Sequence, residues 1–180
     1  MVPDQPGIRP TKAVVVKALC DILQPVIRGL VVLDLFAGTG RVSRRLLAAG
    51  ASRAYAVDLN ECPEENPAEV TWIRADAKDY LNCSSPPEDI DLIYLDPPYK
   101  SSYLEEVLAD VVNCNRLNKQ AIIAVENSIS RAPHPLEFRA ANDRRFCLMR
   151  EREYGITRLS IYQGNRARPA VERSELRHEN

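Results

Sequence analysis

The order of apolar and polar positions divides the chain into a first helix followed by alternating strands and helices. From residue 11 to residue 26, apolar side chains recur every three or four positions, which predicts a helix that starts at Thr11 and ends near Pro25. Short unbroken apolar runs follow, and such runs are typical of strands buried on both faces of a sheet. The predicted elements are this helix, strand 30–36, helix 41–50, strands 53–58, 70–76 and 90–96, helix 103–115 and strand 120–127.

The last third of the chain has a different pattern. Residues 128–144 contain two prolines and little periodicity, which predicts a surface loop. Residues 146–163 form two apolar segments around Tyr154 and Gly155, which indicates an antiparallel hairpin. Residues 165–180 mix charges of both signs without an apolar stripe, so we expect a mobile tail behind a single domain that spans residues 1–164.

Four successive predicted strands end in an acidic residue. The alternation of strands and helices predicts an α/β fold, with a mostly parallel sheet and helices on both of its faces. In such a sheet, ligands bind beyond the carboxyl ends of the strands. We therefore expect a functional site at the edge of the sheet that carries Asp34, Asp58, Asp76 and Asp96.

Composition and charge narrow the class of protein. The 180 residues are 45% hydrophobic and 27% charged, which is ordinary for one globular domain, and the net charge of −1 means that any nucleic-acid contact must be a local patch. The five cysteines are widely spaced and form no pair, which favours reduced thiols over a zinc site or disulfides. No segment is apolar enough for a membrane span or a signal peptide, so we expect a cytoplasmic protein.

A glycine-rich loop follows the first strand. In DLFAGTGRVS, residues 34–43, Gly38 and Gly40 allow the backbone to approach a ligand closely. Ser43 stands where a dinucleotide fingerprint has its third glycine, and Asp58 lies twenty residues after Gly38, where it suits ribose hydroxyls. A nicotinamide-dependent oxidoreductase therefore stays open from this loop alone. Asp76 also has a second interpretation, as the N-cap of a helix.

The fourth acid opens the stretch Asp-Pro-Pro-Tyr, which suits transfer of a methyl group to an aromatic amine. The amine must become more tetrahedral and lose a proton, and the Asp96 carboxylate and the Pro97 carbonyl can accept its N–H groups. Consecutive prolines fix the backbone so that these acceptors face a ligand, and the Tyr99 ring can stack on a flat base. The alternative is that the prolines only end a strand.

These motifs together resemble a known family. DLFAGTG with a downstream DPPY is similar to the class I S-adenosylmethionine-dependent methyltransferases that act on amino groups of nucleobases. With Arg-Pro-Thr at residues 9–11 and Tyr-Gly-Ile-Thr at residues 154–157, the chain more narrowly resembles bacterial enzymes that methylate the N2 amine of guanine in small-subunit ribosomal RNA. The resemblance covers roughly residues 9–163. It implies a Rossmann-like fold with a mostly parallel seven-stranded sheet that ends in a C-terminal antiparallel hairpin.

The resemblance also implies roles for individual residues. The cofactor would be S-adenosyl-L-methionine, and the partner would be nucleic acid, either ribosomal RNA or an assembling small ribosomal subunit. Cofactor binding would fall to Asp34, Phe36, Ala37, Gly38, Thr39, Gly40, Asp58, Asp76 and Ala77. The flipped base would be received by Asp96, Pro97, Pro98 and Tyr99, with Arg9 and Thr11 near the RNA.

The chain departs from the family pattern in three places. Apolar residues 13–16 replace the charged first turn of the helix, and the segment before Arg9 is too short for the N-terminal hairpin of many relatives. Residues 61–70 contain two prolines and cannot form the usual helix between the second and third strands. Other acceptors therefore remain open, namely DNA, another nucleobase or a small amine, as does a non-catalytic relative that binds the cofactor or RNA.

Overall fold

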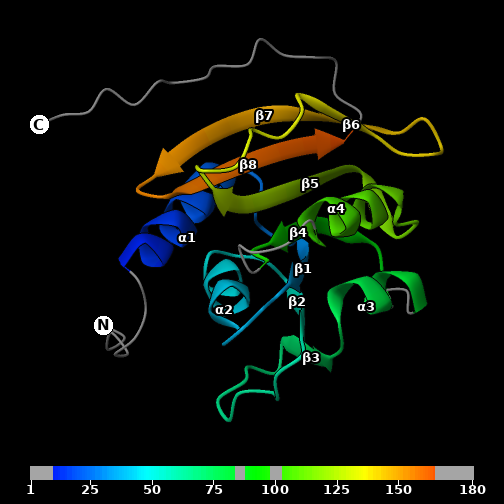
Figure 1. Cartoon of the computed structure of the whole chain (residues 1–180). Coiled ribbons are helices and arrows are strands. Elements are labelled where there is room, and N and C mark those ends of the chain that lie inside the picture. The colour runs from blue at the N-terminus through cyan, green and yellow to red at the C-terminus, as the bar shows by residue number, and fades with distance from the viewer. Residues whose placement is uncertain (1–9, 84–87, 98–102, 165–180) are drawn as a thin grey trace, which may run out of the picture.

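The computed structural model describes residues 10–83, 88–97 and 103–164. Four helices and eight strands alternate along these residues (Figure 1). The helices are α1 (Pro10–Leu23), α2 (Arg41–Ala48), α3 (Ala77–Cys83) and α4 (Tyr103–Asn113). The strands are β1 (Val31–Leu35), β2 (Arg53–Asp58), β3 (Val70–Arg74), β4 (Ile90–Leu95), β5 (Leu117–Ser128), β6 (Glu137–Arg139), β7 (Arg145–Tyr154) and β8 (Thr157–Gly164).

All eight strands form one sheet in the order β3-β2-β1-β4-β5-β8-β7-β6. The first five strands of this order pair in parallel, and β8, β7 and β6 add to them in antiparallel fashion. The predicted α/β class and the closing hairpin are therefore confirmed. The expected number of seven strands is wrong by one, because the short strand β6 pairs with β7 inside the segment 128–144 that was predicted to be a loop.

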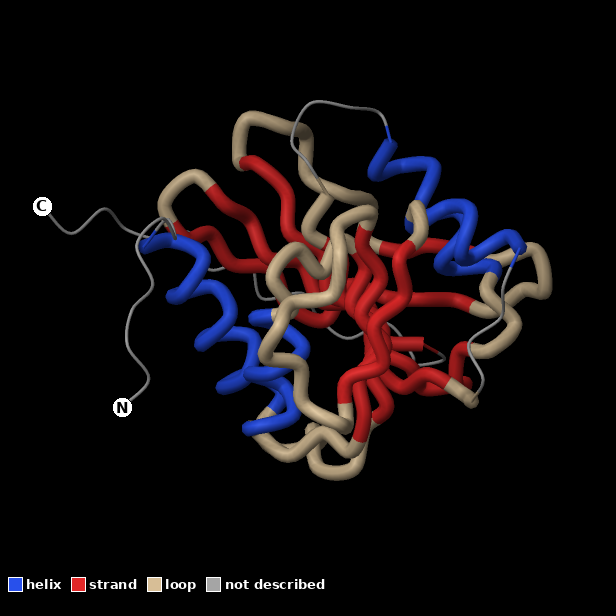
Figure 2. The backbone as a smooth tube through the Cα atoms, turned by 90° about the horizontal axis from the view of Figure 1, so that it is seen from below, coloured by secondary structure: helices blue, strands red, loops and turns tan. Residues whose placement is uncertain are grey.

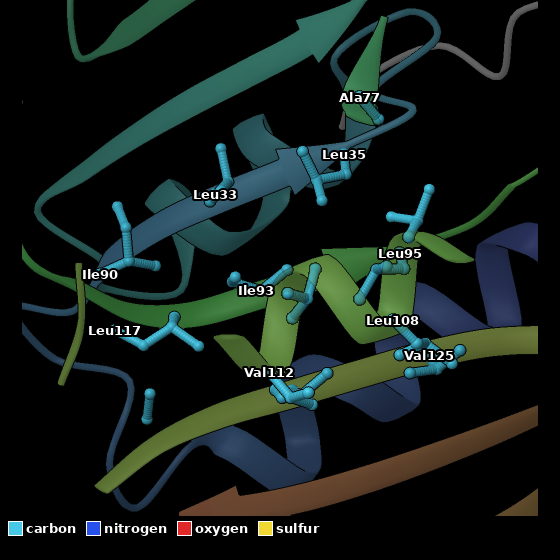
Figure 3. Close-up of a cluster of buried hydrophobic side chains, with 14 of the residues drawn as sticks. Leu33, Leu35, Ala77, Ile90, Ile93, Leu95, Leu108, Val112, Leu117 and Val125 are labelled. Atoms are coloured by element: carbon cyan, nitrogen blue, oxygen red, sulfur yellow. The ribbon is translucent and has the colours of Figure 1, made fainter. Parts of the chain in front are cut away.

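Helices cover both faces of the sheet, as the sequence predicted. In Figure 1, α1 and α2 lie on one side of the central strands, and α3 and α4 lie on the other. Two clusters of buried side chains correspond to these layers. The cluster under α1 and α2 includes Val15, Leu19 and Leu46. The cluster under α3 and α4 includes Leu108 and Val112, which face the apolar side chains of β1, β4 and β5 in Figure 3.

The alternation of side chains along each strand decides which face a residue occupies. In β4, Leu92 and Tyr94 belong to the cluster under α1 and α2, whereas Ile93 and Leu95 belong to the opposite cluster. We call the face of the sheet that is covered by α1 and α2 the α1 face. Because a side chain two positions further along a strand returns to the same face, Asp96 also lies on the α1 face.

Some element boundaries differ from the predicted ones. Helix α1 begins at Pro10 rather than at Thr11, because proline is well suited to the first position of a helix, where its missing N–H is not needed. Helix α3 was not predicted as an element, although Asp76 was considered as its N-cap. The connection from β2 to β3, residues 59–69, contains no helix, as its prolines predicted. Figure 2 shows this connection as a long loop beside the sheet.

Two further predictions concern the C-terminal tail and membrane-spanning helices. The tail 165–180 lies outside the described residues, so its expected mobility stays a prediction. Across the described part of the chain, no helix combines the length and the apolar character needed to cross a membrane.

Candidate functional site at the carboxyl ends of the strands

The structure brings the four predicted acids to one edge of the sheet. Strands β3, β2, β1 and β4 are direct neighbours and run in the same direction. Leu35 is aligned with both Val57 and Leu95, so Asp34, Asp58 and Asp96 lie within one or two positions of the same level. Asp76 follows the end of β3 at this edge. The expected juxtaposition is confirmed.

The glycine loop between β1 and α2 has the backbone that a ligand cradle requires. Gly38 and Gly40 have φ angles of 58° and 68°, in the left-handed region that side chains with a Cβ rarely adopt. A Cβ on Gly38 would meet no atom closer than 4.0 Å, so its surroundings are open, whereas one on Gly40 would lie 3.3 Å from the Trp72 ring. Gly38 therefore leaves room for a ligand, and Gly40 leaves room for a close packing contact.

Asp34 is a fully buried acid with one unsatisfied oxygen. Its Oδ2 atom accepts hydrogen bonds from the backbone N–H of Ser43 at 3.0 Å and from the Ser43 hydroxyl at 2.6 Å. Its Oδ1 atom is buried and has no hydrogen-bond partner among the described residues. Burial raises the pKa of Asp34 to about 7, although the Ser43 hydrogen bonds act in the opposite direction. Ser43, considered above only as a missing glycine, holds this carboxylate in place.

Asp58 ties the end of β2 to the glycine loop. Its Oδ2 atom accepts the backbone N–H of Gly38 at 2.7 Å, and its Oδ1 atom accepts the backbone and side-chain N–H groups of Asn60 at 2.9 and 2.7 Å. Each carboxylate oxygen can accept two hydrogen bonds, so Oδ2 keeps capacity for a ligand hydroxyl. This is the position predicted to bind ribose.

Asp76 is the N-cap of α3, which was the alternative interpretation of this residue. Its Oδ1 atom accepts the backbone N–H groups of Lys78 at 2.9 Å and Asp79 at 3.3 Å, and also the Tyr103 hydroxyl. Partial burial would raise the pKa of Asp76, but these hydrogen bonds outweigh it and lower the pKa. The Tyr103 ring also meets the edge of Phe36 at 5.9 Å between centroids. Phe36, Asp76 and Tyr103 therefore form one wall next to the glycine loop.

The remaining cofactor candidates differ in their exposure. Ala37 is nearly buried, and the side chain of Ala77 packs in the core under α3 and α4. Thr39 is exposed at the tip of the loop. The N–H groups of Phe36 and Ala37 both donate to the carbonyl of Val57, which fixes the loop against β2.

Asp96 lies at the end of β4 and is contacted by an unexpected residue. The Lys12 ammonium group donates a hydrogen bond to Asp96 Oδ2. The Asp96 side chain is only 8% exposed, while Lys12 is about half exposed. Pro97 is buried. Lys12 lies in the first turn of α1, where the family has charged residues and the apolar residues 13–16 of this chain led us to expect none.

The described residues omit part of the predicted site. Pro98 and Tyr99, and Arg9 on the proposed RNA side, lie outside them, and for Thr11 only the helical backbone is described. The roles of these four residues stay predictions.

Sequence reasoning missed a second buried acid beside Asp96. Glu126 near the end of β5 is 1% exposed, and its Oε1 atom accepts the Tyr94 hydroxyl. Its Oε2 atom is buried and has no hydrogen-bond partner among the described residues. An acid near the end of a strand was the signal used for the other four, and Glu126 fits it. It was overlooked because the run around it was read only as a buried strand.

Comparison with known proteins supports the same class of enzyme. The chain is 28% identical over 137 residues to ribosomal RNA small subunit methyltransferase D of Escherichia coli strain K12, an alignment that covers 71% of this chain and 68% of the relative. Its fold matches a putative methyltransferase, yhhF, from Escherichia coli with a TM-score of 0.71 and 23% identity over 89% of each chain. It also matches SMU.1697c, a putative methyltransferase from Streptococcus mutans in complex with SAH. That match has a TM-score of 0.56 and 16% identity, and covers 88% of this chain and 99% of the other.

These findings confirm the predicted class I methyltransferase fold and enzyme class, so the nicotinamide alternative is set aside. The family resemblance inferred from the motifs is confirmed by a match that spans residues 1–163, nearly the whole described fold. The chain belongs to the family described as Conserved hypothetical protein 95.

Proposed function

We propose that the protein uses S-adenosyl-L-methionine to methylate the exocyclic amine of a nucleobase, and that this acceptor is the N2 amine of a guanine in small-subunit ribosomal RNA. The name of the Escherichia coli relative supports ribosomal RNA as the acceptor class. Its place of action would then be the cytoplasm, on free RNA or on an assembling small subunit.

The residues around the glycine loop fit this cofactor. The unpaired, buried Oδ1 atom of Asp34 is a natural partner for a cationic group, because an isolated carboxylate in an apolar setting is costly. Asp58 has an acceptor for ribose, and the open space at Gly38 admits a close approach. When bound, the cofactor supplies a methyl group on a positively charged sulfur. The complex of SMU.1697c with SAH supports this choice.

Asp96 is the residue that would act on the acceptor amine. Methyl transfer forms a nitrogen–carbon bond, breaks the sulfur–carbon bond and leaves a neutral thioether. The amine must lose one proton in the process. Asp96 Oδ2 can accept an amine N–H and then receive this proton, provided that Lys12 moves aside. The position of Asp96 at the end of β4, beside the buried Asp34, is the single observation that carries the proposal.

The first test measures methyl transfer and cofactor binding separately. We expect Asp96→Ala to reduce transfer of labelled methyl groups by at least about a hundredfold while cofactor affinity measured by calorimetry changes little. Asp58→Ala should instead weaken cofactor binding. Asp89→Ala is the matched control, because Asp89 is an exposed acid before β4 that pairs with Arg116. Unchanged transfer by the Asp96→Ala variant would remove Asp96 from its proposed role.

The acceptor needs an experiment of its own. Mass spectrometry of nucleosides from the ribosomal RNA of cells with and without the gene should show the loss of an N2-methylguanosine. A loss of methylated adenine or cytosine from DNA, with ribosomal RNA unchanged, would select the DNA alternative. No change in either pool would leave a small amine as the acceptor or a protein without catalytic activity.

A second candidate function is a non-catalytic protein that binds the cofactor or RNA. The observation that favours it is the occupation of Asp96 Oδ2 by Lys12, which blocks the proposed acceptor atom. Methyl transfer by the wild-type protein and by Lys12→Met distinguishes the two. If Lys12 only covers Asp96 between turnovers, the wild-type protein transfers methyl groups, and if the site is inactive, neither protein does.

A further inference from the structure

Strand register places a second carboxylate next to the proposed catalytic acid. Strands β4 and β5 run in parallel with Leu95 aligned to Val125, so Asp96 and Glu126 follow at the same level of neighbouring strands. Tyr94 and Ala124, two positions earlier, both belong to the cluster under α1 and α2. Asp96 and Glu126 therefore share the α1 face.

Asp34 also belongs to this group. It is aligned with Tyr94 across the pair β1–β4, and Val32, two positions before it, lies in the same buried cluster. Three carboxylates from three adjacent strands thus meet on one face, at the carboxyl edge of the sheet. We call Asp34, Asp96 and Glu126 the acid cluster.

The surroundings of Glu126 provide little compensation for a negative charge. Tyr94 donates one hydrogen bond to Oε1, and Oε2 has no hydrogen-bond partner among the described residues. In β8, the residue opposite Glu126 is Leu159, and Arg152 lies opposite Leu159, one strand further away in β7. A buried carboxylate with one neutral donor is stable only when it carries a proton or meets a cation.

The charges around the acid cluster also favour a protonated Glu126. From α1, Lys12 pairs with Asp96, and its positive charge also acts to lower the pKa of Glu126. Burial first, and the charge of Asp96 second, raise the pKa of Glu126 to about 7. Burial likewise raises the pKa of Tyr94, so its phenol stays neutral and remains a donor. The cluster as a whole therefore retains a proton near neutral pH.

We propose that Glu126 is a positioning residue of the methyl-transfer site: held by Tyr94, it keeps a proton beside Asp96 and releases it to solvent when a positively charged cofactor binds. Until the cation is present, the proton on Glu126 avoids a second buried negative charge beside Asp96. The inference rests on the proposed function, since it requires a cationic ligand next to the acid cluster.

The proposal separates the two forms of the cofactor. S-adenosylmethionine carries a positive sulfur, and S-adenosylhomocysteine carries a neutral one but is otherwise alike. Only the positive form should displace the proton from Glu126. Because proton release accompanies binding, the affinity for S-adenosylmethionine should rise with pH around neutrality, by at most about tenfold per pH unit for one proton. The affinity for S-adenosylhomocysteine should rise less.

Calorimetry in two buffers measures the released proton directly. For each cofactor form, the apparent binding enthalpies in phosphate and in Tris at pH 7 differ by the number of protons released, multiplied by the difference between the protonation enthalpies of the two buffers. For the wild-type protein we expect up to about one proton more with S-adenosylmethionine than with S-adenosylhomocysteine, since the pKa values of Glu126 and Asp34 both lie at about 7. In Glu126→Gln this difference should fall to the share that Asp34 releases.

The matched control is Glu88→Gln. Glu88 also accepts a hydrogen bond from a tyrosine, Tyr55, at 2.6 Å, but it lies before β4 at the opposite end of the sheet. This variant should release as many protons as the wild type. Equal proton release by Glu126→Gln and the wild type would overturn the proposal.

A second variant guards against a folding defect in Glu126→Gln. Tyr94→Phe keeps Glu126 but removes the hydrogen bond that favours its charged form. The pH at which S-adenosylmethionine affinity rises should then move upward relative to the wild type, and an unmoved profile would contradict the proposal. If the wild-type protein binds neither cofactor form, the proposed function fails and this inference fails with it. If it binds both without Glu126-dependent proton release, only this inference fails.

Discussion

The two ends of the parallel sheet both contain partly or fully buried acids. The two ends differ in how many of the carboxylate oxygens accept hydrogen bonds. At the amino end, Asp91 accepts the backbone N–H of Val31 at 2.9 Å with one oxygen and the Asn118 amide with the other. At the carboxyl end, Asp34 and Glu126 each leave one oxygen unpaired. A native structure rarely leaves buried acceptors without partners unless another molecule uses them. On this basis we interpret Asp91 as a structural acid and propose a functional role for Asp34 and Glu126.

The amino end of the sheet also carries a surface hollow. A depression of about 710 Å³ lies at the amino end of the sheet, lined by residues such as Leu30, Asp91 and Lys119. The acids in and near it are exposed or already paired within the protein. The carboxyl end, with the glycine loop and the acid cluster, is where we propose the chemistry takes place. We therefore place the site by its unpaired buried groups and not by the size of a hollow.

The largest expected effect comes from replacing one acid at each end of the sheet, Asp34 and Asp91, with the neutral asparagine. Asp34→Asn should weaken S-adenosylmethionine binding by about a hundredfold, because it removes the buried negative charge, while the protein stays folded. Asp91→Asn should leave cofactor affinity within about twofold and cost on the order of 1–3 kcal/mol of stability, because one buried hydrogen bond is lost. Calorimetry and thermal unfolding measure the two effects. The comparison fails if both variants change the same quantity.

Glycine substitutions at the two ends should show the same division. In Gly164→Ala, the new Cβ would lie 2.5 Å from the backbone oxygen of Lys119, so we expect a loss on the order of 2 kcal/mol in stability with cofactor affinity unchanged. In Gly38→Ala, the Cβ meets no close atom, and the positive φ costs only about 1 kcal/mol. Cofactor affinity should nevertheless fall, by about tenfold. Equal affinities of the two variants would show that the loop does not contact the cofactor.

A smaller effect is expected in the pH dependence of stability. The folded protein binds a proton at Glu126 more tightly than the unfolded chain, because burial raises its pKa from 4.5 to about 7. Stability from this group is therefore full below pH 4.5 and falls as the pH rises toward 7. Glu126→Gln removes this loss, worth about 3 kcal/mol at most, so its Tm at pH 8 should exceed that of the wild type by about 5 °C.

Glu88→Gln serves as the control for this measurement. The Glu88 side chain is 41% exposed, and its Tm curve should run parallel to that of the wild type between pH 5 and pH 8. If the two glutamine variants follow the same curve, the proton is not held at Glu126.

Local patterns predicted the central fold because buried parallel strands need unbroken apolar runs. The strands β1, β2 and β4 were found in this way, and their terminal acids fixed the edge where the site lies. The three-residue strand β6 could not be predicted, since its pairing with β7 depends on tertiary contacts and not on its own sequence. Helix α3 is a single short segment whose start depends on the capping contacts of Asp76.

The contacts of the site that the sequence did not predict share one physical reason. Lys12 reaches Asp96 across 84 positions of sequence, and Tyr94 reaches Glu126 across 32. These contacts depend on how α1 packs and on the register between β4 and β5. No motif contains both partners of either pair, so spacing along the chain could not reveal them.

The strand order also has a consequence for the time course of folding. The hairpin β7–β8 joins neighbouring segments, and the helix-free connection between β2 and β3 closes a short loop, whereas β1 and β4 join residues about sixty positions apart. Because entropy opposes long loop closures more strongly, we expect β1 and β4 to meet late. That late step is the one that brings Asp34 beside Asp96. The nascent chain therefore meets the repulsion among its acids only once the flanking strands are in place to withstand it.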